Sequence, residues 1–214
     1  MDFAALANEC APYVAHQTMA AIVKTESNFQ PLAIGINGGA RLVRSAQTKE
    51  EAVVTANWLI ANGFNIDLGL GQVNSANLAK FGLTVENAFD PCKNLAVAGK
   101  ILQGNYLVAR RKGHDEQAAL HAALSAYNTG SYSRGFANGY VQKVVNNAPI
   151  ARSASSATAL PIPLVSMTAQ MVQTRPAQSA RRSLKPAGQR EVQASLLIAK
   201  PAVSGTDKQS FLVY

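Results

Sequence analysis

The segment "IVKTESNFQPLAIG", residues 22–35, decides the fold because it places a glutamate where a helix is predicted to end. Met19, Ile22 and Val23 precede this glutamate by seven, four and three positions, so they form an apolar stripe on one helix face. Glu26 lies on that same face. Burial of an ionised carboxylate is costly, so a glutamate against an apolar wall has a raised pKa. Two interpretations are open: a functional acid, or a surface glutamate at a helix end.

The chain up to about residue 147 is predicted to be mainly helical. Helices are predicted over residues 12–27, 48–62, 90–111 and 115–128, with a short one from about Ser75 and a final one from about Phe136. Thr48 and Glu51 have the spacing of a capping box at the start of the second helix, and Gly63 would end it. Residues 32–43, "LAIGINGGARLV", combine glycines with alternating apolar residues, which is typical of a loop or a short hairpin.

Composition changes sharply near residue 148. Residues 1–147 carry 12 Lys and Arg against 10 Asp and Glu, whereas residues 148–214 carry 8 against 2. The later segment is rich in Ala, Ser, Pro and Gln, so it has little bulky apolar surface to offset the entropy of ordering it. We expect one domain over residues 1–147 and a basic, largely disordered tail over 148–214. The tail would be either a solubilising tether or a segment that docks on a partner.

Several classes of protein are not favoured by the sequence. No run of eighteen apolar residues occurs, so no transmembrane segment is expected, and the first residues lack the pattern of a secretory signal. His16, His114 and His121 show no ligand-like pairing, so neither a metal nor another cofactor is expected. The basic tail lacks the aromatic pattern of an RNA-binding sheet, so nucleic acid is not expected as a partner.

The chemistry that the residues support best is acid–base work by Glu26. A carboxyl group that stays protonated near neutral pH can donate its proton to a leaving oxygen, as glycoside cleavage requires. Asp67 is the nearest rival for a second carboxylate, and we interpret it as a structural residue or loop cap. Cys10 and Cys92 are the only cysteines, and they are either two buried thiols or one disulfide, which would indicate an oxidising compartment.

Four short segments, in order, resemble the signatures of one enzyme family. "TESNFQPLAIG" at 25–35, "GLGQVN" at 69–74 and "SAYNTG" at 125–130 are similar to the three signatures of the soluble lytic transglycosylases, a lysozyme-like family. "GYVQKV" at 139–144 resembles the tyrosine segment that follows them. The surroundings of the two cysteines and the ending "GFANGYVQKV" resemble more closely the VirB1-like branch, the wall-opening enzymes encoded with type IV secretion systems.

The resemblance implies a mainly α, lysozyme-like helical domain with a small loop or hairpin lobe, and Glu26 as its single catalytic acid. In this family the acid protonates the glycosidic oxygen between N-acetylmuramic acid and N-acetylglucosamine and then acts as a base. The 6-hydroxyl of the muramic acid attacks instead of water, which gives a 1,6-anhydro product. Because this nucleophile is intramolecular, a second catalytic carboxylate is dispensable.

The resemblance also implies roles for other residues. Those expected to bind substrate are Ser27, Gln72, Asn74, Tyr127, Asn128 and Tyr140. For the two tyrosines core packing is the alternative, and for Asn128 it is a turn at a helix end. Gly71 stands where the family commonly has methionine, which predicts a missing apolar contact with the sugar. Cys10 and Cys92 would form a disulfide.

The leading hypothesis is a peptidoglycan lytic transglycosylase that opens a local gap in the cell wall for a secretion or conjugation apparatus. Its partners would be peptidoglycan glycan strands and, through the tail, type IV secretion components. Its place would be the periplasm or cell envelope. The alternatives are a non-catalytic peptidoglycan-binding assembly factor and a hydrolytic muramidase.

Overall fold

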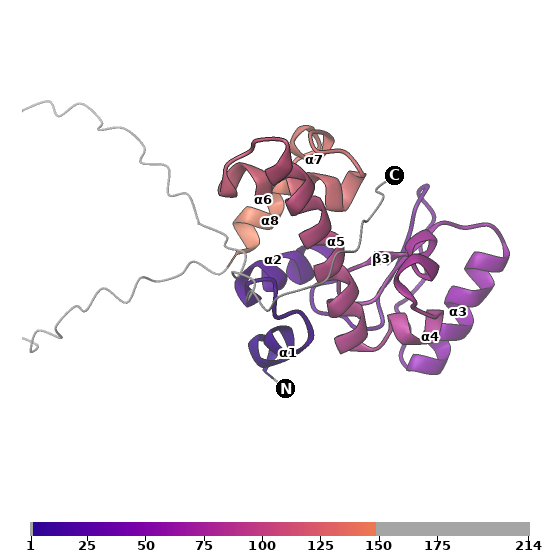
Figure 1. Cartoon of the computed structure of the whole chain (residues 1–214). Coiled ribbons are helices and arrows are strands. Elements are labelled where there is room, and N and C mark those ends of the chain that lie inside the picture. The colour runs from indigo at the N-terminus through magenta and orange to yellow at the C-terminus, as the bar shows by residue number, and fades with distance from the viewer. Residues whose placement is uncertain (1, 149–214) are drawn as a thin grey trace, which may run out of the picture. The chain divides into compact units, whose positions relative to one another are not determined.

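A computed structural model describes residues 2–148, and over this range the chain is mainly helical, as the sequence predicts (Figure 1). Its α-helices are α1 (Phe3–Cys10), α2 (His16–Glu26), α3 (Lys49–Ala61), α4 (Val85–Ala88), α5 (Pro91–Arg111), α6 (Glu116–Thr129), α7 (Arg134–Ala137) and α8 (Tyr140–Asn147). The tail predicted over 148–214 lies outside the described residues, Ala148 excepted.

Helix α5 is the longest element and forms the centre of the core (Figure 1). It packs against α1 and α6, while α2 packs against α1 and α8. Its start follows from the sequence, because the Asp90 side chain accepts a hydrogen bond from the Lys93 N–H and Pro91 occupies the first turn. Side chains from α2, α5 and α6 fill the interior, among them Met19, Ile22, Leu95, Leu102, Leu120 and Leu124.

The amino-terminal prediction of one helix over 12–27 is wrong at its start. The chain forms two helices, α1 and α2, and α2 begins only at His16. Asp2 caps α1 by accepting a hydrogen bond from the Ala4 N–H at 3.2 Å. Helix α1 has only eight residues, five of them Ala or Leu or Phe, so its apolar pattern is too short to stand out from the sequence alone.

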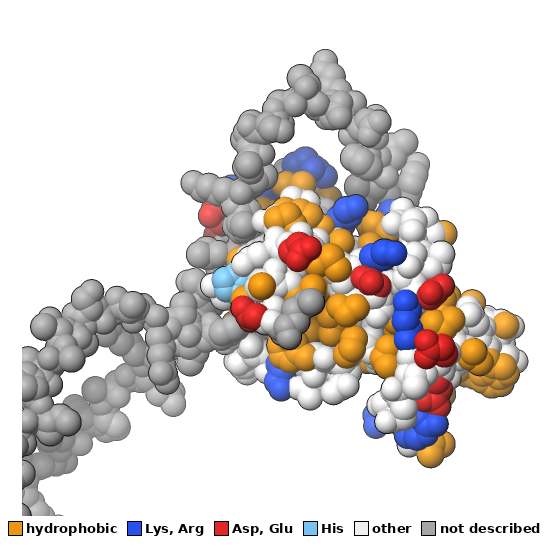
Figure 2. Space-filling model, turned by 90° about the horizontal axis from the view of Figure 1, so that it is seen from below, with side chains coloured by type: hydrophobic (Ala, Val, Ile, Leu, Met, Phe, Trp, Pro, Cys, Tyr) orange, Lys and Arg blue, Asp and Glu red, His pale blue; other side chains and the backbone are white. Residues whose placement is uncertain are grey.

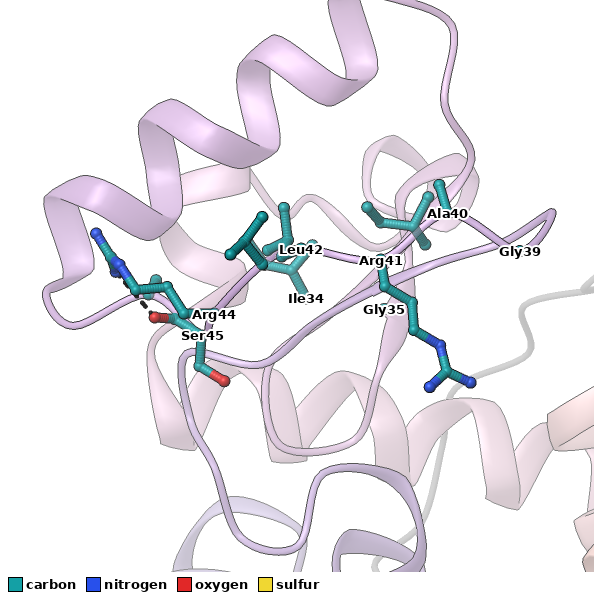
Figure 3. Close-up of a pocket in the computed structure, with 11 residues that line it drawn as sticks. Ile34, Gly35, Gly39, Ala40, Arg41, Leu42, Arg44 and Ser45 are labelled. Carbon is teal, nitrogen blue, oxygen red and sulfur yellow. Dashed lines mark hydrogen bonds between the residues drawn. The ribbon is translucent and has the colours of Figure 1, made fainter.

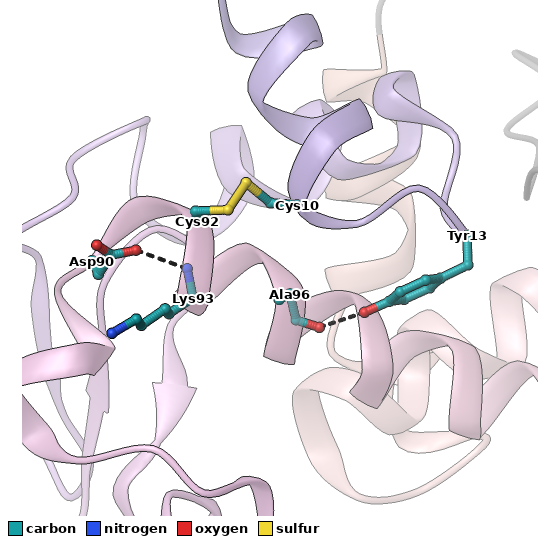
Figure 4. The surroundings of a disulfide bond; sticks show 6 residues. All are labelled: Cys10, Tyr13, Asp90, Cys92, Lys93 and Ala96. Atoms are coloured by element: carbon teal, nitrogen blue, oxygen red, sulfur yellow. Dashed lines mark hydrogen bonds between the residues drawn. A yellow bond between two sulfur atoms is a disulfide. The ribbon is translucent and has the colours of Figure 1, made fainter.

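Cys10 and Cys92 form a disulfide between the end of α1 and the first turn of α5 (Figure 4). The two residues are 82 positions apart in the sequence. A second contact lies beside the disulfide, where the Tyr13 hydroxyl donates to the Ala96 carbonyl at 2.6 Å. Together the covalent and hydrogen bonds attach the amino-terminal segment to the central helix.

A small antiparallel sheet has the strand order β1 (Ile34–Ile36), β2 (Ile66–Leu68) and β3 (Val73–Asn74). The hairpin considered within residues 32–43 is not present, because β1 pairs with β2, beyond α3. The segment after β1 is held elsewhere: the Arg44 guanidinium binds the carboxylate of Glu51 on α3.

The capping pattern at α3 is confirmed in part. The Thr48 hydroxyl accepts a hydrogen bond from the Glu51 N–H at 3.2 Å, as predicted. The Glu51 carboxylate, however, accepts from the Gln47 N–H at 2.7 Å and from Arg44. Helix α3 ends at Ala61, in agreement with a stop near Gly63, whose φ is +79°.

The other predicted helices fit the structure with two corrections. The segment from Ser75 forms two single 3-10 turns, η1 (Ser75–Asn77) and η2 (Ala79–Phe81), instead of a short α-helix. The helix predicted from Phe136 is divided into α7 and α8 by Gly139, whose φ is +78°. A left-handed residue interrupts an α-helix, so Tyr140 begins a new one with a new direction.

Candidate active site

Glu26 is the last residue of α2, and the chain turns away directly after it. The next residues include Asn28 and Phe29, both with positive φ, at 50° and 63°. Ile22 and Val23, which share the face of Glu26, are fully buried. Glu26 itself is half-buried, so its carboxyl group lies at the margin of the apolar core. This is the position that the sequence pattern predicts.

The Tyr140 hydroxyl donates a hydrogen bond to Glu26 Oε1 at 2.5 Å. Burial raises the pKa of Glu26 to about 7, and the nearby negative charge of Asp67 adds to the rise. The hydrogen bond from Tyr140 and the positive charge of Lys143 act in the opposite direction. Near neutral pH the carboxyl group is therefore protonated in about half of the molecules, so it can both give and take a proton.

Both tyrosines near the acid remain neutral. Burial, together with the charge of Glu26, raises the pKa values of Tyr127 and Tyr140 well above their usual range. Each phenol is a hydrogen-bond donor: Tyr140 to Glu26, and Tyr127 to the carbonyl of Gly71 at 2.6 Å. Tyr127 thus fixes the turn that carries the second predicted motif, while Tyr140 holds one oxygen of the acid.

Ser27 is buried, with 8% of its surface exposed, and its hydroxyl forms hydrogen bonds within the protein. It donates to the Leu70 carbonyl at 2.8 Å and lies 3.2 Å from the Val23 carbonyl. This contact lies within the protein, whereas the resemblance implies that Ser27 binds substrate. It joins the residue after the acid to the turn at residues 69–72, so Ser27 positions the two motifs relative to each other.

Asn94 on α5 holds the same turn from the other side, and it was not predicted as a site residue. Its Oδ1 accepts from the Gly71 N–H at 2.7 Å, and its Nδ2 donates to the carbonyls of Leu68 and Ala88 at 2.9 and 2.8 Å. Asn94 is fully buried. The sequence signal that could have revealed Asn94 is a polar residue on the apolar face of α5. A buried amide needs hydrogen-bond partners for each of its polar atoms, so such a residue is expected to hold another segment.

The backbone at Gly71 approaches α5 closely. A Cβ atom at this position would lie 2.6 Å from Ala98 Cβ and 3.0 Å from the Tyr127 hydroxyl. A side chain at this position would therefore clash with α5 and with Tyr127. Gly71, which stands where the family commonly has methionine, therefore lets the turn pack tightly against α5. The sequence led us to expect a missing apolar contact with the sugar instead.

Gln72 also belongs to the turn and has a positive φ of 48°. Its Nε2 donates to the carbonyls of Gly69 and Ala33 at 2.9 and 3.3 Å. Its Oε1 lies 2.6 Å from the position that a Cβ of Gly35 would occupy. The side chain therefore bridges the turn and the start of β1, and a Cβ at residue 35 would displace its amide oxygen.

Asn74 and Asp67 belong to a polar network on the sheet. Asn74 Nδ2 donates to Asp67 Oδ1 at 2.7 Å, and Asn37 Nδ2 donates to Asp67 Oδ2 at 2.9 Å. Both amides also donate to Asn65 Oδ1, at 2.6 and 2.7 Å. Each oxygen of the Asp67 carboxylate is thus held by an asparagine, which fits the structural interpretation of Asp67.

Asn128 is exposed and lies at the end of α6. Its Oδ1 accepts from Asn138 Nδ2 at 3.1 Å, and Asn138 Oδ1 accepts from the Tyr140 N–H at 3.0 Å. Asn128 is thus connected through Asn138 to the start of the helix that carries Tyr140. Asn138 is a further residue that the sequence did not single out.

Acidic and basic side chains are interspersed on the face shown in Figure 2, so no field of one sign extends over it. Among residues 2–148 there is no cluster of three His, Cys, Asp or Glu side chains that could hold a metal ion. No helix in that same range is both long and apolar enough to span a membrane.

The chain is similar to one known protein family and to several named proteins. Residues 3–148 match the profile of the family described as "Transglycosylase SLT domain". The chain is 49% identical over 157 residues to the "Type IV secretion system protein virB1" of Brucella suis biovar 1 (strain 1330), which covers 70% of this chain and 65% of that protein. It is 42% identical over 143 residues to "Protein virB1" of Agrobacterium fabrum (strain C58 / ATCC 33970), or 67% of this chain and 58% of that protein. The chain thus spans less than two thirds of the length of these curated relatives. No solved structure has significant similarity to it.

Proposed function

We propose, because the chain belongs to the transglycosylase SLT family, that it is a lytic transglycosylase that cleaves the glycan strands of peptidoglycan. The single observation that carries the proposal is the Glu26 carboxyl group, which is hydrogen-bonded to Tyr140 and has a pKa of about 7. Such a group is an acid at the start of a reaction and a base at its end.

The geometry supports different roles for the two oxygens of the Glu26 carboxyl group. Tyr140 occupies Oε1, while Oε2 has no hydrogen bond to any described residue. Oε2 is therefore the oxygen that would carry the proton toward the glycosidic oxygen. Because the Tyr140 phenol stays neutral, it would stabilise the carboxylate that forms when this proton leaves.

The reaction proceeds without water. The bond between C1 of N-acetylmuramic acid and the oxygen of N-acetylglucosamine breaks, and the proton of Glu26 goes to that oxygen. The 6-hydroxyl oxygen of the muramic acid then forms a bond to C1, and its proton returns to Glu26. The products are an N-acetylglucosamine end and a 1,6-anhydro end, so Glu26 is regenerated and one carboxyl group is sufficient.

The other residues would support this chemistry in two ways. We assign Gln72, Asn74 and Asn128 to the surface that binds the sugars, because each is linked to the acid or to Tyr140 through one neighbour. Gln72 belongs to the turn that Ser27 holds, Asn74 donates to Asp67, whose charge acts on Glu26, and Asn128 is bound to Asn138 beside Tyr140. We assign Ser27 and Tyr127 to positioning, because their hydroxyl groups donate to carbonyls of the turn at residues 69–72. The turn then keeps the amide of Gln72 in a fixed place.

The cellular role that we propose is the local opening of the cell wall for a type IV secretion or conjugation apparatus. It is supported by the relatives named type IV secretion system protein virB1. The disulfide between Cys10 and Cys92 supports a place in the periplasm or cell envelope, because disulfides persist in oxidising compartments. Residues 1–147 would form the catalytic domain, and the basic segment 148–214 would tether it or dock on secretion components.

The experiment compares the wild type with Glu26→Gln on purified insoluble peptidoglycan and measures the release of soluble muropeptides. We expect release by the wild type and a loss of roughly a thousandfold in Glu26→Gln, within the range for removal of a general acid. Glu9→Gln removes the same charge from an exposed residue of α1 and should release as much as the wild type. Equal release by Glu26→Gln and the wild type would refute the role of the acid.

A further inference from the structure

The sheet has a free edge at β1. Strand β1 is the outer strand, and its bonds toward β2 include the Ala33 carbonyl and the Asn37 N–H, each at 2.9 Å. In an antiparallel ladder alternate residues face the partner strand, so the polar backbone groups of Ile34 and Ile36 point away from β2. Within the described part of the chain, no backbone hydrogen bond joins them to residues 40–46. A free edge of this kind can pair with an added extended peptide.

A groove runs along this free edge (Figure 3). It has a volume of about 610 Å³ and is bounded by β1 on one side and by residues 39–46 on the other. Ile34 and Leu42 give it an apolar centre. A peptide in the groove could therefore use its backbone on the strand edge and its side chains on the apolar centre.

Two arginines lie along the groove, and they differ in their partners. The Arg44 guanidinium binds both carboxylate oxygens of Glu51 and the Ser45 carbonyl, so its charge is compensated. Arg41 is exposed, and no residue among 2–148 forms a hydrogen bond or ion pair with its guanidinium. In Figure 3 the two guanidinium groups extend toward opposite ends of the groove. Arg41 thus supplies an uncompensated positive charge that can pair with a carboxylate in a bidentate manner.

Gly35, which lines the groove, also contacts residues of the proposed active site. Gly35 of β1 lies opposite Asp67 of β2, whose charge acts on Glu26, and the amide of Gln72 packs against Gly35. Neighbouring strands are about 4.8 Å apart, so an occupant on the outer side of β1 would lie roughly 10 Å from β2. An extended peptide spans that distance with about three residues at ~3.3 Å each.

We propose that the groove binds the stem peptide of peptidoglycan, with amide groups of the peptide hydrogen-bonded to the free edge of β1 and a peptide carboxylate bound to Arg41. The proposal rests on the proposed function, since the stem peptide is attached to the muramic sugar that the enzyme would cleave. Charge favours this occupant, because stem peptides carry free carboxylates. The enzyme would then select glycan strands that still carry their peptides.

The test uses two substrates, purified glycan strands with stem peptides and the same strands after an amidase has removed the peptides. For Arg41→Ala we expect kcat/KM to fall about tenfold on the peptide-bearing strands and to stay unchanged on the stripped ones. Arg111→Ala removes a charge from an exposed arginine at the end of α5 and should change neither value. An equal effect of Arg41→Ala on both substrates, or none on either, would overturn the proposal.

A second variant tests the strand edge. Ile36→Pro removes an N–H that makes no hydrogen bond in the sheet, so the fold should be retained. We expect the same selective loss on peptide-bearing strands, and unchanged selectivity would contradict the pairing with β1. If the wild type cleaves neither substrate, the proposed function fails, and binding of the released stem peptides is then measured by calorimetry. Weaker binding to Arg41→Ala than to Arg111→Ala would support the groove, and equal or absent binding would refute it.

Discussion

Replacement of Glu26 by Gln should stabilise the fold at high pH but not at low pH. The pKa of Glu26 is raised from 4.5 to about 7, mainly because burial disfavours the charged form. Below pH 4.5 the carboxyl group is protonated in both the folded and the unfolded chain, so it costs nothing. As the pH rises from 4.5 to about 7, the unfolded chain releases its proton while the folded protein keeps it, and stability falls.

The size of the effect follows from the shift. A shift of this size corresponds to about 3 kcal/mol of unfolding free energy, which is lost in full above pH 7. Because Glu26 is only half-buried, we expect water to reduce this to about 2 kcal/mol. Glutamine is neutral at every pH and can still accept the hydrogen bond from Tyr140. Glu26→Gln should therefore gain about 2 kcal/mol over the wild type between pH 4.5 and pH 8.

The assay is urea unfolding of both proteins at pH 4.5 and pH 8, followed by circular dichroism. Glu9→Gln, a change at an exposed residue, measures how far a change in net charge alone alters the pH dependence. A difference between wild type and Glu26→Gln that is equal at both pH values would refute the raised pKa. The same result would remove the physical basis for Glu26 as a neutral-pH acid.

Three further changes test the hydrogen bond from Tyr140, the packing of Gly71 and the disulfide. Tyr140→Phe removes a hydrogen bond that lowers the pKa of Glu26. The rate of cleavage should fall roughly tenfold, and the pH above which activity is lost should rise from about 7. A pH–rate profile whose upper limit is unchanged would contradict this. Gly71→Ala places a Cβ 2.6 Å from that of Ala98 and should cost about 1 to 3 kcal/mol in urea unfolding, part of which Ala98→Gly restores; no loss would mean that the approach is looser. Reduction of the disulfide, whose cysteines are 82 positions apart, should cost about 4 kcal/mol, and an unchanged urea midpoint with thiol present would refute it.

The part of the site that depends on local sequence could be predicted. Met19, Ile22 and Val23 mark the buried face of α2, and helical periodicity alone then places Glu26 on that face. The long helix α5 is also predictable, because Pro91 marks its start. The position of Glu26 and the start of α5 can be predicted without knowing which segments pack against them.

The contacts between distant segments could not be predicted. Asn94 holds the turn at residues 69–72 only because α5 passes behind it, and no local pattern reveals that approach. The same is true of Ser27, which looks like a polar residue beside the acid but donates to the Leu70 carbonyl. The pairing of β1 with β2 across α3 depends on packing as well, whereas a hairpin is the simplest interpretation of the local glycines.

The central claim is that Glu26 cleaves the glycan strand without water, and cleavage in water enriched in ¹⁸O tests it most directly. Purified strands are digested by the wild type in the labelled water, and the new muramic ends are analysed by mass spectrometry. We expect 1,6-anhydro ends without the label. Reducing muramic ends that carry ¹⁸O would contradict it, and would assign the enzyme to hydrolysis, with Asp67 as the first residue to examine for activation of water.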